Sequence, residues 1–371
     1  MQRNRLLERL QIKLFTSAKL NLNFREAKSS LTERTRYMSK QTRRITSIGG
    51  SALIEGIMMR GPKKSTVCVR TGPDEIYSED VSINTIPSKI KAFKLPILRG
   101  FAGLIDSMRL SYKSLMLSAD KAIDSAEIEE EPSKFEKWLD KKFGDKLVKV
   151  LMVFASVIGI AFAIGLFFFL PSFLFDLCGN FIPAFRVDEA GSNAELVRLW
   201  KSIFEGVLKL ILFFSYIIIV SQTPDMKRVF MYHGAEHKTI FCYENEEELT
   251  VENVRKQIRF HPRCGTSFMV IMLIISILAG LLVPVAPFGL PVLRPIFKIL
   301  LIPLVCGLGY ELIKLCGKHD NKLTRIIAAP GLWAQRITTK EPDDGMIEVA
   351  IKAIESVIPD DGSDIVQNCG C

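Results

Sequence analysis

The chain has 371 residues, of which 48% are hydrophobic, and a formal net charge of +9. Several long apolar runs argue against a soluble protein of two or three domains and place the architecture in a lipid bilayer. The eight cysteines lack the regular spacing of a disulfide framework, which argues against a small secreted domain.

The first 48 residues carry the whole positive excess. Residues 1–48 contain 12 Lys and Arg against three Glu, and the charges of the remaining chain balance. We expect this Ser- and Thr-containing segment to be disordered. It could lie on an anionic membrane, contact nucleic acid or serve as a transit peptide. Translation could begin at Met1 or at Met38, which directly precedes the first stretch that looks ordered.

Residues 49–149 are expected to form a cytoplasmic α+β region. The runs STVCVRT and EIYSEDVSI, separated by the turn GPDE and preceded by the glycine-rich stretch IGGSALIEGIMMRGP, predict a small sheet. Apolar residues from Leu98 to Met116 recur at helical spacing and predict an amphipathic helix. This helix could pack on the sheet or lie on the membrane. A Lys-rich segment, 134–149, then leads into the first apolar run.

Four apolar runs predict four transmembrane helices, at 150–175, 203–221, Ser267–Phe288 and Ile296–Cys316. Domain boundaries follow from them: 150–221 for the first two helices, 222–266 for a loop containing His and Cys, 267–316 for the last two helices and 317–371 for a C-terminal region. Glu205 and Lys209 are four residues apart and are expected to neutralise one another near one end of the second helix. The expected fold is an α-helical integral membrane protein with a small α+β cytoplasmic domain.

Lys and Arg in the flanking segments predict the orientation. The segments before the first run, between the second and third, and after the fourth hold six, seven and five of them, whereas the two intervening segments hold three and one. Because positive flanks stay on the cytoplasmic side, we expect a multi-pass protein of the cell membrane with both termini and the 222–266 loop in the cytoplasm. The cysteines on the cytoplasmic side, at positions 68, 242, 264, 369 and 371, would then be reduced.

Two histidines and a glutamate lie within five positions of that loop. Thr223, Pro224 and Asp225 are typical of a helix start and predict a helix over 224–241. On this helix His233, Glu236 and His237 share a face, and the string fits the H-x-x-E-H pattern of inverted zinc peptidases. Gly234 weakens such a helix, and no second glutamate ligand follows at a recognisable spacing.

Further ligands could come from RFHPRCGTSF, which follows a short helix predicted to start near Thr250. If the loop folds back, His233, His237, His261 and Cys264 can converge on one ion, and nitrogen with sulfur ligands suits Zn²⁺. With three ligands and an open position, Glu236 would accept the proton of a zinc-bound water, whereas four ligands would make the site structural. Alternatively, the histidines hydrogen-bond locally or contact phosphate headgroups.

A last amphipathic helix is predicted near the C-terminus. Its apolar positions lie between Ile347 and Val357, after the acidic start EPDDG, where carboxylates suit a helix N-terminus. We expect this helix to dock on the cytoplasmic domain.

Five segments, IGGSALIEGIMMRGP, PILRGFAGLIDSMRLSYKSL, YHGAEHKTIFCYE, FHPRCGTSF and TTKEPDDGMIEVAIKAI, resemble the YqhQ-like family of bacterial membrane proteins. The resemblance covers residues 47–358 in order. This family has unknown function and is sometimes labelled as predicted metal-dependent enzymes. The resemblance implies metal candidates at His233, Glu236, His237, His261 and Cys264, with Glu55 and Arg60 as neighbours of the site or as turn and packing residues.

Two functions compete at this point. The first is metal-dependent hydrolysis with Glu236 as the catalytic base, and the alternative is a non-enzymatic membrane scaffold or assembly factor with a structural metal or none. A transporter finds less support because intramembrane charges are sparse and no internal repeat is apparent. The expected partners are the bilayer, another membrane protein and a second copy of the chain, rather than nucleic acid.

Overall fold

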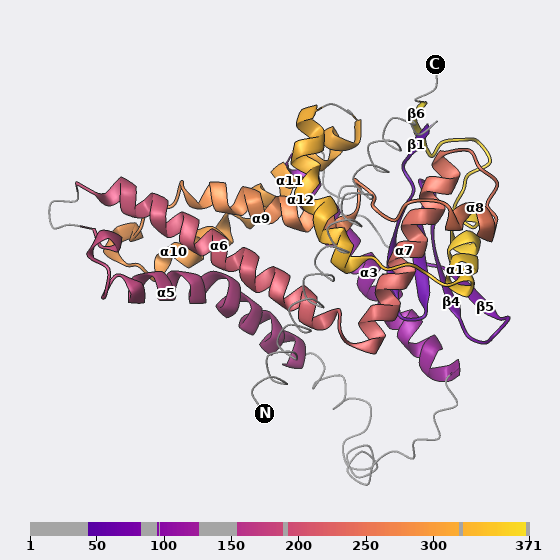
Figure 1. Ribbon diagram of the computed structural model, residues 1–371, viewed down its shortest axis with the longest axis horizontal. Coiled ribbons are helices and arrows are strands. Elements are labelled where there is room, and N and C mark those ends of the chain that lie inside the picture. The colour runs from indigo at the N-terminus through magenta and orange to yellow at the C-terminus, as the bar shows by residue number, and fades with distance from the viewer. Residues whose placement is uncertain are drawn as a thin grey trace, which may run out of the picture.

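The computed structural model describes residues 44–82, 95, 97–125, 154–187, 192–318 and 322–368. Most of the basic extension with Met38, the Lys-rich segment 134–149, Cys369 and Cys371 lie outside the described residues. Figure 1 shows two parts side by side, an elongated bundle of helices on the left and a mixed α/β part on the right.

The predicted sheet is present and antiparallel. Its order is β2 (Gly49–Leu53), β3 (Gly56–Arg60), β4 (Ser65–Arg70) and β5 (Ile76–Asp80), each strand pairing with the next along the chain. Alternate residues face opposite sides of the sheet, and both sides are buried. Ile57, Met59 and Cys68 belong to one apolar cluster, whereas Met58, Val67 and Val69 belong to another. The sheet is therefore the middle layer of three.

Helices cover both faces of this sheet (Figure 1). The amphipathic helix α3 (Leu98–Ser125) packs on one face through Leu110, so it forms part of the core. The other face is covered by α7 (Pro224–Glu244) and by α13 (Asp344–Glu355), the predicted C-terminal helix, whose cap Asp343 accepts a hydrogen bond from the Met346 N–H at 2.8 Å. A short helix, α8 (Val251–Arg255), begins after Thr250 as predicted.

Part of the segment predicted to be disordered forms a strand. The basic extension was predicted to reach residue 48, but β1 (Arg44–Thr46) pairs with β6 (Ile365–Asn368) in a second, two-stranded sheet. Arg44 also donates to the carbonyl of Tyr243 at 3.0 Å through Nη2. The last basic residue of the extension is thus held by contacts with distant segments, which local composition does not reveal.

Two helices of the left-hand part are long and apolar enough to cross a membrane. The first, Phe154–Cys178, contains a π-helical turn, η2 (Gly165–Phe169), followed by α5 (Leu170–Cys178). Pro171 lacks a backbone N–H, which is compatible with the widened turn before it. After a 3₁₀ turn, η3 (Pro183–Phe185), the second helix α6 (Ala194–Val220) runs back.

The later apolar runs are less regular than predicted. Helix α9 (Gly265–Gly280) has 16 residues and spans about 24 Å, less than the hydrocarbon thickness of about 30 Å. The fourth run forms α10 (Leu293–Leu300) and α11 (Ile302–Lys318), bent by 42° at a break, after the 3₁₀ turn η4 (Pro287–Gly289). Two to three candidate spans are therefore present among the described residues, rather than four regular ones.

A further helix, α12 (Lys322–Thr338), was not predicted, and it links the two parts. It packs on α9, and Gly331 allows the close approach, since a Cβ there would lie 2.6 Å from the Cα of Ser267. Helix α3 of the α/β part contacts α11 of the helical part. Arg99 of α3 and Glu311 of α11 form a two-pronged ion pair there, with distances of 2.6 and 2.7 Å.

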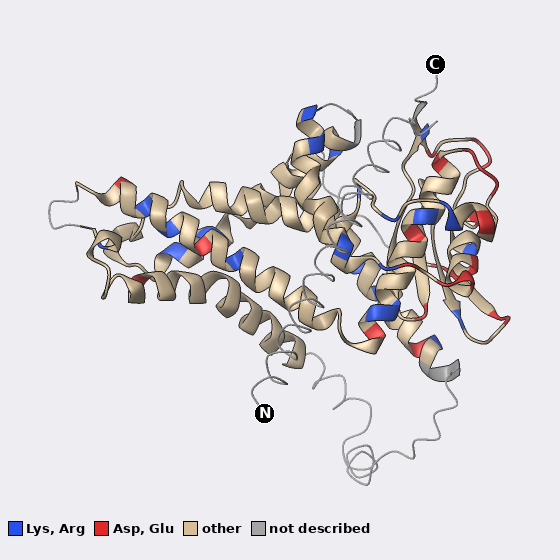
Figure 2. Cartoon of the chain, in the orientation of Figure 1, with Lys and Arg blue, Asp and Glu red and all other residues tan. Residues whose placement is uncertain are grey.

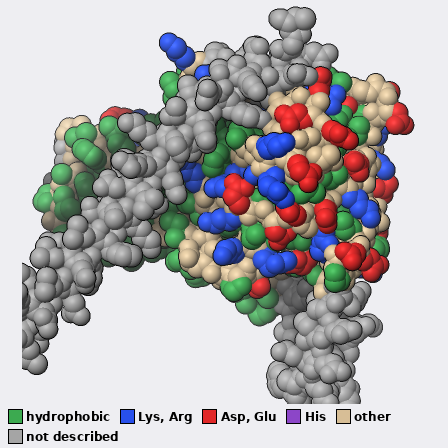
Figure 3. Space-filling model, turned by 45° about the vertical axis from the view of Figure 1, so that its right-hand side comes forward, with side chains coloured by type: hydrophobic (Ala, Val, Ile, Leu, Met, Phe, Trp, Pro, Cys, Tyr) green, Lys and Arg blue, Asp and Glu red, His purple; other side chains and the backbone are tan. Residues whose placement is uncertain are grey.

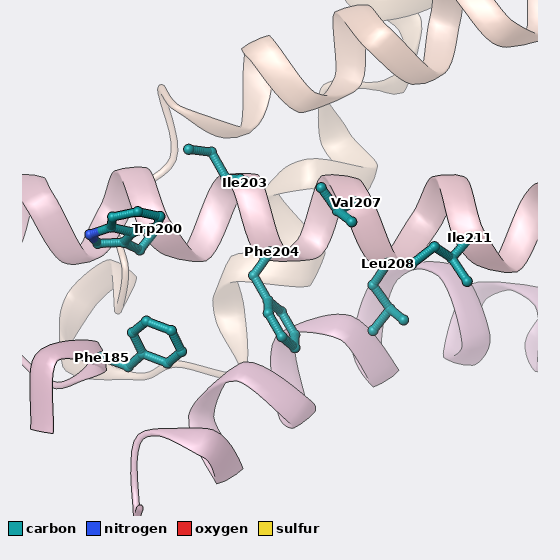
Figure 4. Close-up of a pocket in the computed structure, with 7 residues that line it drawn as sticks. All are labelled: Phe185, Trp200, Ile203, Phe204, Val207, Leu208 and Ile211. Atoms are coloured by element: carbon teal, nitrogen blue, oxygen red, sulfur yellow. The ribbon is translucent and has the colours of Figure 1, made fainter. Parts of the chain in front are cut away.

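Charge distinguishes the two parts. Figure 2 shows few charged residues in the helical part apart from a group around α6 and α10. On the α/β part, the face seen in Figure 3 interleaves acidic and basic side chains, as expected of a surface in water. A groove of about 330 Å³ on α6 is lined instead by apolar side chains (Figure 4): Phe185, Trp200, Ile203, Phe204, Val207, Leu208 and Ile211.

Glu205 and Lys209 do not pair with each other as expected. Glu205 instead forms ion pairs with Arg294 and Lys298 of α10, while the Lys209 ammonium lies 4.7 Å from the centre of the Phe168 ring. The expectation used only the spacing within α6, and the partners come from a helix about 90 residues later.

Candidate metal centre

Helix α7 places the histidines and the glutamate. It begins at Pro224, as predicted, but the Thr223 hydroxyl donates to the Val220 carbonyl at 2.9 Å instead of capping α7. Gly234 has a clear role, because a Cβ there would lie 2.0 Å from the carbonyl oxygen of Lys340, whose own N–H donates to Phe230 O at 2.8 Å. The glycine therefore admits the segment after α12 against the helix.

Both histidines are oriented in the same way. His233 Nδ1 lies 2.8 Å from the carbonyl oxygen of Thr338, and His237 Nδ1 lies 2.6 Å from that of Arg259. A carbonyl only accepts hydrogen bonds, so each Nδ1 must carry the proton. Each Nε2 can then act as a metal ligand, and this pattern of an Nδ1–H bonded to a carbonyl is the usual support for a metal-binding histidine.

Cys264 completes the group from another element. It is the residue preceding α9, and its Sγ lies 3.1 Å from His233 Nε2 and 3.3 Å from Thr266 Oγ1. Burial would raise the pKa of the Cys264 thiol, but the charges and hydrogen bonds of His233 and His237 hold it well below its usual value. The start of a helix also favours a thiolate. Burial would lower the pKa of His233, yet Cys264 raises it to about 9.

The three donor atoms fit the geometry of zinc. One atom each from His233, His237 and Cys264 lie within 4.8 Å of one another. Tetrahedral bonds of about 2.0 Å to nitrogen and 2.3 Å to sulfur separate such ligands by roughly 3.5 Å. For this spacing the 3.1 Å contact between His233 and Cys264 would open by a few tenths of an ångström, and the widest separation, up to 4.8 Å, would close by about 1 Å. Side-chain rotation can supply both shifts. Two nitrogens and one sulfur leave a fourth position for a further ligand.

Glu236 is buried beside this group, with 4% of its surface exposed. Its Oε2 has no hydrogen-bond partner among the described residues, and its other contact is the backbone N–H of Gly50 in β2. A Cβ on Gly50 would lie 3.0 Å from the Glu236 carboxyl carbon, so the glycine makes room for it. Burial raises the pKa of Glu236, although the neighbouring histidines oppose the shift. An unpartnered buried carboxyl oxygen indicates a role in proton transfer or ligand binding.

His261 lies next to the group but is directed elsewhere. Its ring is 5.6 Å from that of His237, while its Nε2 lies 3.8 Å from Glu244 Oε2. Burial lowers the pKa of His261 to about 4, and Glu244 only partly offsets this shift. The structure thus brings together three of the four ligand candidates and leaves His261 in an adjacent ion-pair network.

That network fixes the backbone next to Cys264. Arg263 donates to Glu244 and to the carbonyl of Thr46, and the Thr46 N–H donates to Glu244 Oε1 at 2.9 Å. Burial would raise the pKa of Glu244, but hydrogen bonds from His261 and Thr46 and the charge of Arg263 lower it to about 2. Glu244 is therefore ionised at neutral pH and ties β1, α7 and the segment before α9 together.

Three supporting groups were not found from the sequence. Gln335 of α12 is fully buried and accepts from the His261 N–H at 2.8 Å, while its Nε2 donates to His261 O at 2.7 Å and to Ser267 Oγ at 2.9 Å. The other two are the carbonyls of Thr338 and Arg259. A glutamine in an apolar stretch and two backbone carbonyls give no local pattern, so no sequence signal marks them.

Glu55 and Arg60 lie away from the three donor atoms. Glu55 has a positive φ of 49° in the β2–β3 turn and forms a two-pronged ion pair with Arg228, both contacts at 2.5 Å. It also accepts from the Tyr232 hydroxyl at 3.2 Å. Arg60 is exposed at the end of β3. Glu55 therefore shapes a turn and anchors the outer side of α7.

Comparison with known proteins shows the family of the chain that carries this site. A family described as "Protein of unknown function (DUF1385)" matches residues 95–360, a range that includes all four ligand candidates and Glu236. The chain belongs to this family. The DUF1385 chain is also 34% identical over 312 residues to "Uncharacterized protein YqhQ" of Bacillus subtilis (strain 168), covering 84% of this chain and 92% of that protein. No solved structure matches.

Proposed function

We propose that this DUF1385 protein crosses the cell membrane several times and holds Zn²⁺ at its cytoplasmic face, where it carries out metal-dependent hydrolysis. One observation carries the proposal. Two Nδ1–H groups bonded to backbone carbonyls leave two Nε2 atoms grouped with a cysteine sulfur, beside a buried carboxyl oxygen that lacks a partner. Stability alone does not account for three such donors and an unsatisfied acid in one place.

The residues have separable roles. His233, His237 and Cys264 would hold the ion, which supplies Lewis acidity toward a water molecule or a substrate oxygen when bound. Glu236 is placed to accept a proton from the attacking water and to return it to the leaving group. Arg263 and Gln335 hold the backbone on either side of His261 and so position Cys264.

The proposed topology has four crossings with both termini inside. The connecting residues 179–187 and 281–292 belong to the end of the helical part far from the sheet, as Figure 1 shows, and hold few basic residues. The basic flank 222–266, which contains α7 and α8, belongs to the α/β part. This arrangement would place the three donors close to the inner surface of the bilayer, within reach of substrates from the membrane or the cytosol.

The test separates metal binding from catalysis. We expect purified full-length protein to contain about one zinc per chain by elemental analysis. Cys264→Ser and the His233→Ala/His237→Ala double variant should lose it, while Glu236→Gln should retain it. Cys242→Ser is the matched control, because Cys242 is a buried thiol of α7, the helix of both histidines, and lies outside the donor group.

Activity is then measured on a panel of fluorogenic esters, amides and phosphoesters. Zinc-loaded wild type should hydrolyse at least one class, with Glu236→Gln slower by about 10²-fold or more. Zinc retained without turnover on any class would support the alternative, a scaffold with a structural metal. Protein that folds without zinc and behaves identically in all variants would overturn the metal site itself.

A further inference from the structure

The helical part contains a buried group of charges with more positive than negative members. We call Glu205, Lys209, Arg294 and Lys298 the basic group. Their exposed fractions are 2%, 6%, 0% and 8%. Glu205 accepts from Arg294 Nε at 3.3 Å and from Lys298 Nζ through its other oxygen. One carboxylate therefore faces three cations.

The partners of each cation show which members of the basic group carry the excess positive charge. Arg294 is fully engaged, since besides Glu205 it donates to Ser202 Oγ at 2.8 Å and to the carbonyls of Gly280, Val283 and Pro284. These carbonyls belong to the last residue of α9 and to the residues just after it. Arg294 therefore provides hydrogen bonds that water cannot supply inside a bilayer. It has a structural role.

Lys209 is different. It forms no ion pair with a carboxylate among the described residues, and the attraction of Glu205 that it feels is shared with Arg294 and Lys298. Its ammonium contacts the face of the Phe168 ring. The neighbouring pair of Lys201 and Asp176, 2.5 Å apart, is neutral in itself and does not compensate Lys209. Two positive charges thus remain without a counter-charge in a region of low dielectric, where each is costly unless an anion is bound.

The backbone is irregular on two sides of the basic group, and a glycine makes room for it on a third. Phe168 belongs to the π-helical turn Gly165–Phe169, which α10 contacts. Helix α10 ends at the 42° bend before α11. On α9, a Cβ at Gly280 would lie 3.1 Å from Lys298 Nζ, so the glycine makes room for that ammonium. Interrupted helices and π-helical turns within a membrane typically surround a ligand site.

We propose that the basic group binds a phosphate-bearing ligand next to Lys209 and Lys298. Two surplus positive charges match the charge of a phosphate monoester or of inorganic phosphate near neutral pH, which is close to −2. Glu205 lies about 16 Å along α6 from Ala194, so the site is well inside the helical part. This inference uses none of the donors of the zinc site and stands or falls independently of it.

The experiment uses purified full-length protein in neutral detergent. One arm measures binding of radiolabelled inorganic phosphate, and the other measures retention of phosphatidic acid, against phosphatidylcholine, by native mass spectrometry. Phosphate bound alone indicates a soluble source, and phosphatidic acid bound alone indicates a lipid source. Either result supports the site.

Variants locate the binding. Lys209→Met and Lys298→Met should weaken it by at least about tenfold, because each removes one of the surplus charges. Lys209→Arg should retain most of it, and Lys227→Met, which removes an exposed lysine of α7, should leave it unchanged. The proposal is overturned if the wild type binds neither probe, or if Lys209→Met binds as tightly as the wild type. If a variant does not fold, binding of the two probes by the wild type alone decides between support and rejection of the site.

Discussion

At the scale of single residues, the buried side chains Gln335 and Glu244 use their polar atoms in hydrogen bonds around the three donor atoms. Gln335 makes three buried hydrogen bonds around His261 and Ser267, and Glu244 makes contacts with Thr46 and Arg263. Glu236, like the hydroxyl of Thr338, keeps an oxygen with no partner among the described residues, and Glu236 is the carboxyl group beside the three donor atoms. Gln335 and Glu244 are therefore satisfied, and an unpartnered carboxyl oxygen lies where the proposed chemistry would need it.

Gln335→Ala should lower both stability and metal content. It leaves the N–H and carbonyl of His261 and the Ser267 hydroxyl without their partner, at a cost of roughly 2–4 kcal/mol. Thermal unfolding and zinc content of the purified protein measure the two effects. Gln222→Ala, an exposed position at the end of α6, is the control and should change neither. Unaltered zinc content in a destabilised Gln335→Ala variant would show that the glutamine does not position Cys264.

The lowered pKa of Glu244 predicts that the folded protein loses stability in acid. This pKa is about 2 in the folded protein against an ordinary 4.5, so the contribution of Glu244 is complete above pH 4.5 and is lost as the pH falls toward 2. The difference corresponds to roughly 3 kcal/mol. The lowered pKa of His261, about 4 against 6.5, acts in the same direction between pH 6.5 and 4.

Melting temperatures of wild type, Glu244→Gln and the exposed control Glu248→Gln between pH 7 and pH 3 test this. Glu244→Gln should melt lower at pH 7 and converge with the wild type in acid. Parallel curves for all three proteins would contradict the assignment.

At the scale of elements, α7 shows what could be predicted from sequence and what could not. Its start at Pro224 and the shared face of His233 and His237 follow from local pattern, and so do the strands and α13. The orienting carbonyls of Thr338 and Arg259, the ion pairs of Glu205 and the whole of α12 depend on contacts between segments 20 to 105 residues apart. Periodicity carries no information about such contacts.

Gly234 provides a test of the packing of this element. Gly234→Ala would place a methyl group 2.0 Å from the Lys340 carbonyl oxygen, and the overpacking should destabilise the protein by about 1–3 kcal/mol. Gly103→Ala is the matched control, because it adds the same group to helix α3 with no atom within 4 Å and should raise stability slightly. If both variants melt like the wild type, the segment after α12 does not lie against α7 in solution.

At the scale of the whole molecule, the helical part and the α/β part meet near Cys264, the residue before α9, where α12 packs on α9. The basic group and the proposed zinc site lie toward opposite ends of α9, since Arg294 binds carbonyls at its C-terminal end. The number of crossings determines whether the two sites face the same compartment. Two long helices are consistent with membrane crossing, and α9 with the bent pair α10–α11 forms the less regular remainder.

Reporter fusions test the four-crossing topology. Alkaline phosphatase, active only outside the cytoplasm, should be active when fused after Asn180 or Gly289, and green fluorescent protein should fluoresce when fused after Asn245. If instead the phosphatase fused after Gly289 is inactive and green fluorescent protein fused there fluoresces, α9 and α10 enter the membrane and return without crossing it.

The most direct measurement is X-ray absorption at the zinc edge of the purified full-length protein. The proposed site predicts one sulfur at about 2.3 Å and two imidazole nitrogens at about 2.0 Å from the metal, with the sulfur lost in Cys264→Ser. A first shell of oxygen ligands only, or a sulfur that persists in Cys264→Ser, would contradict it.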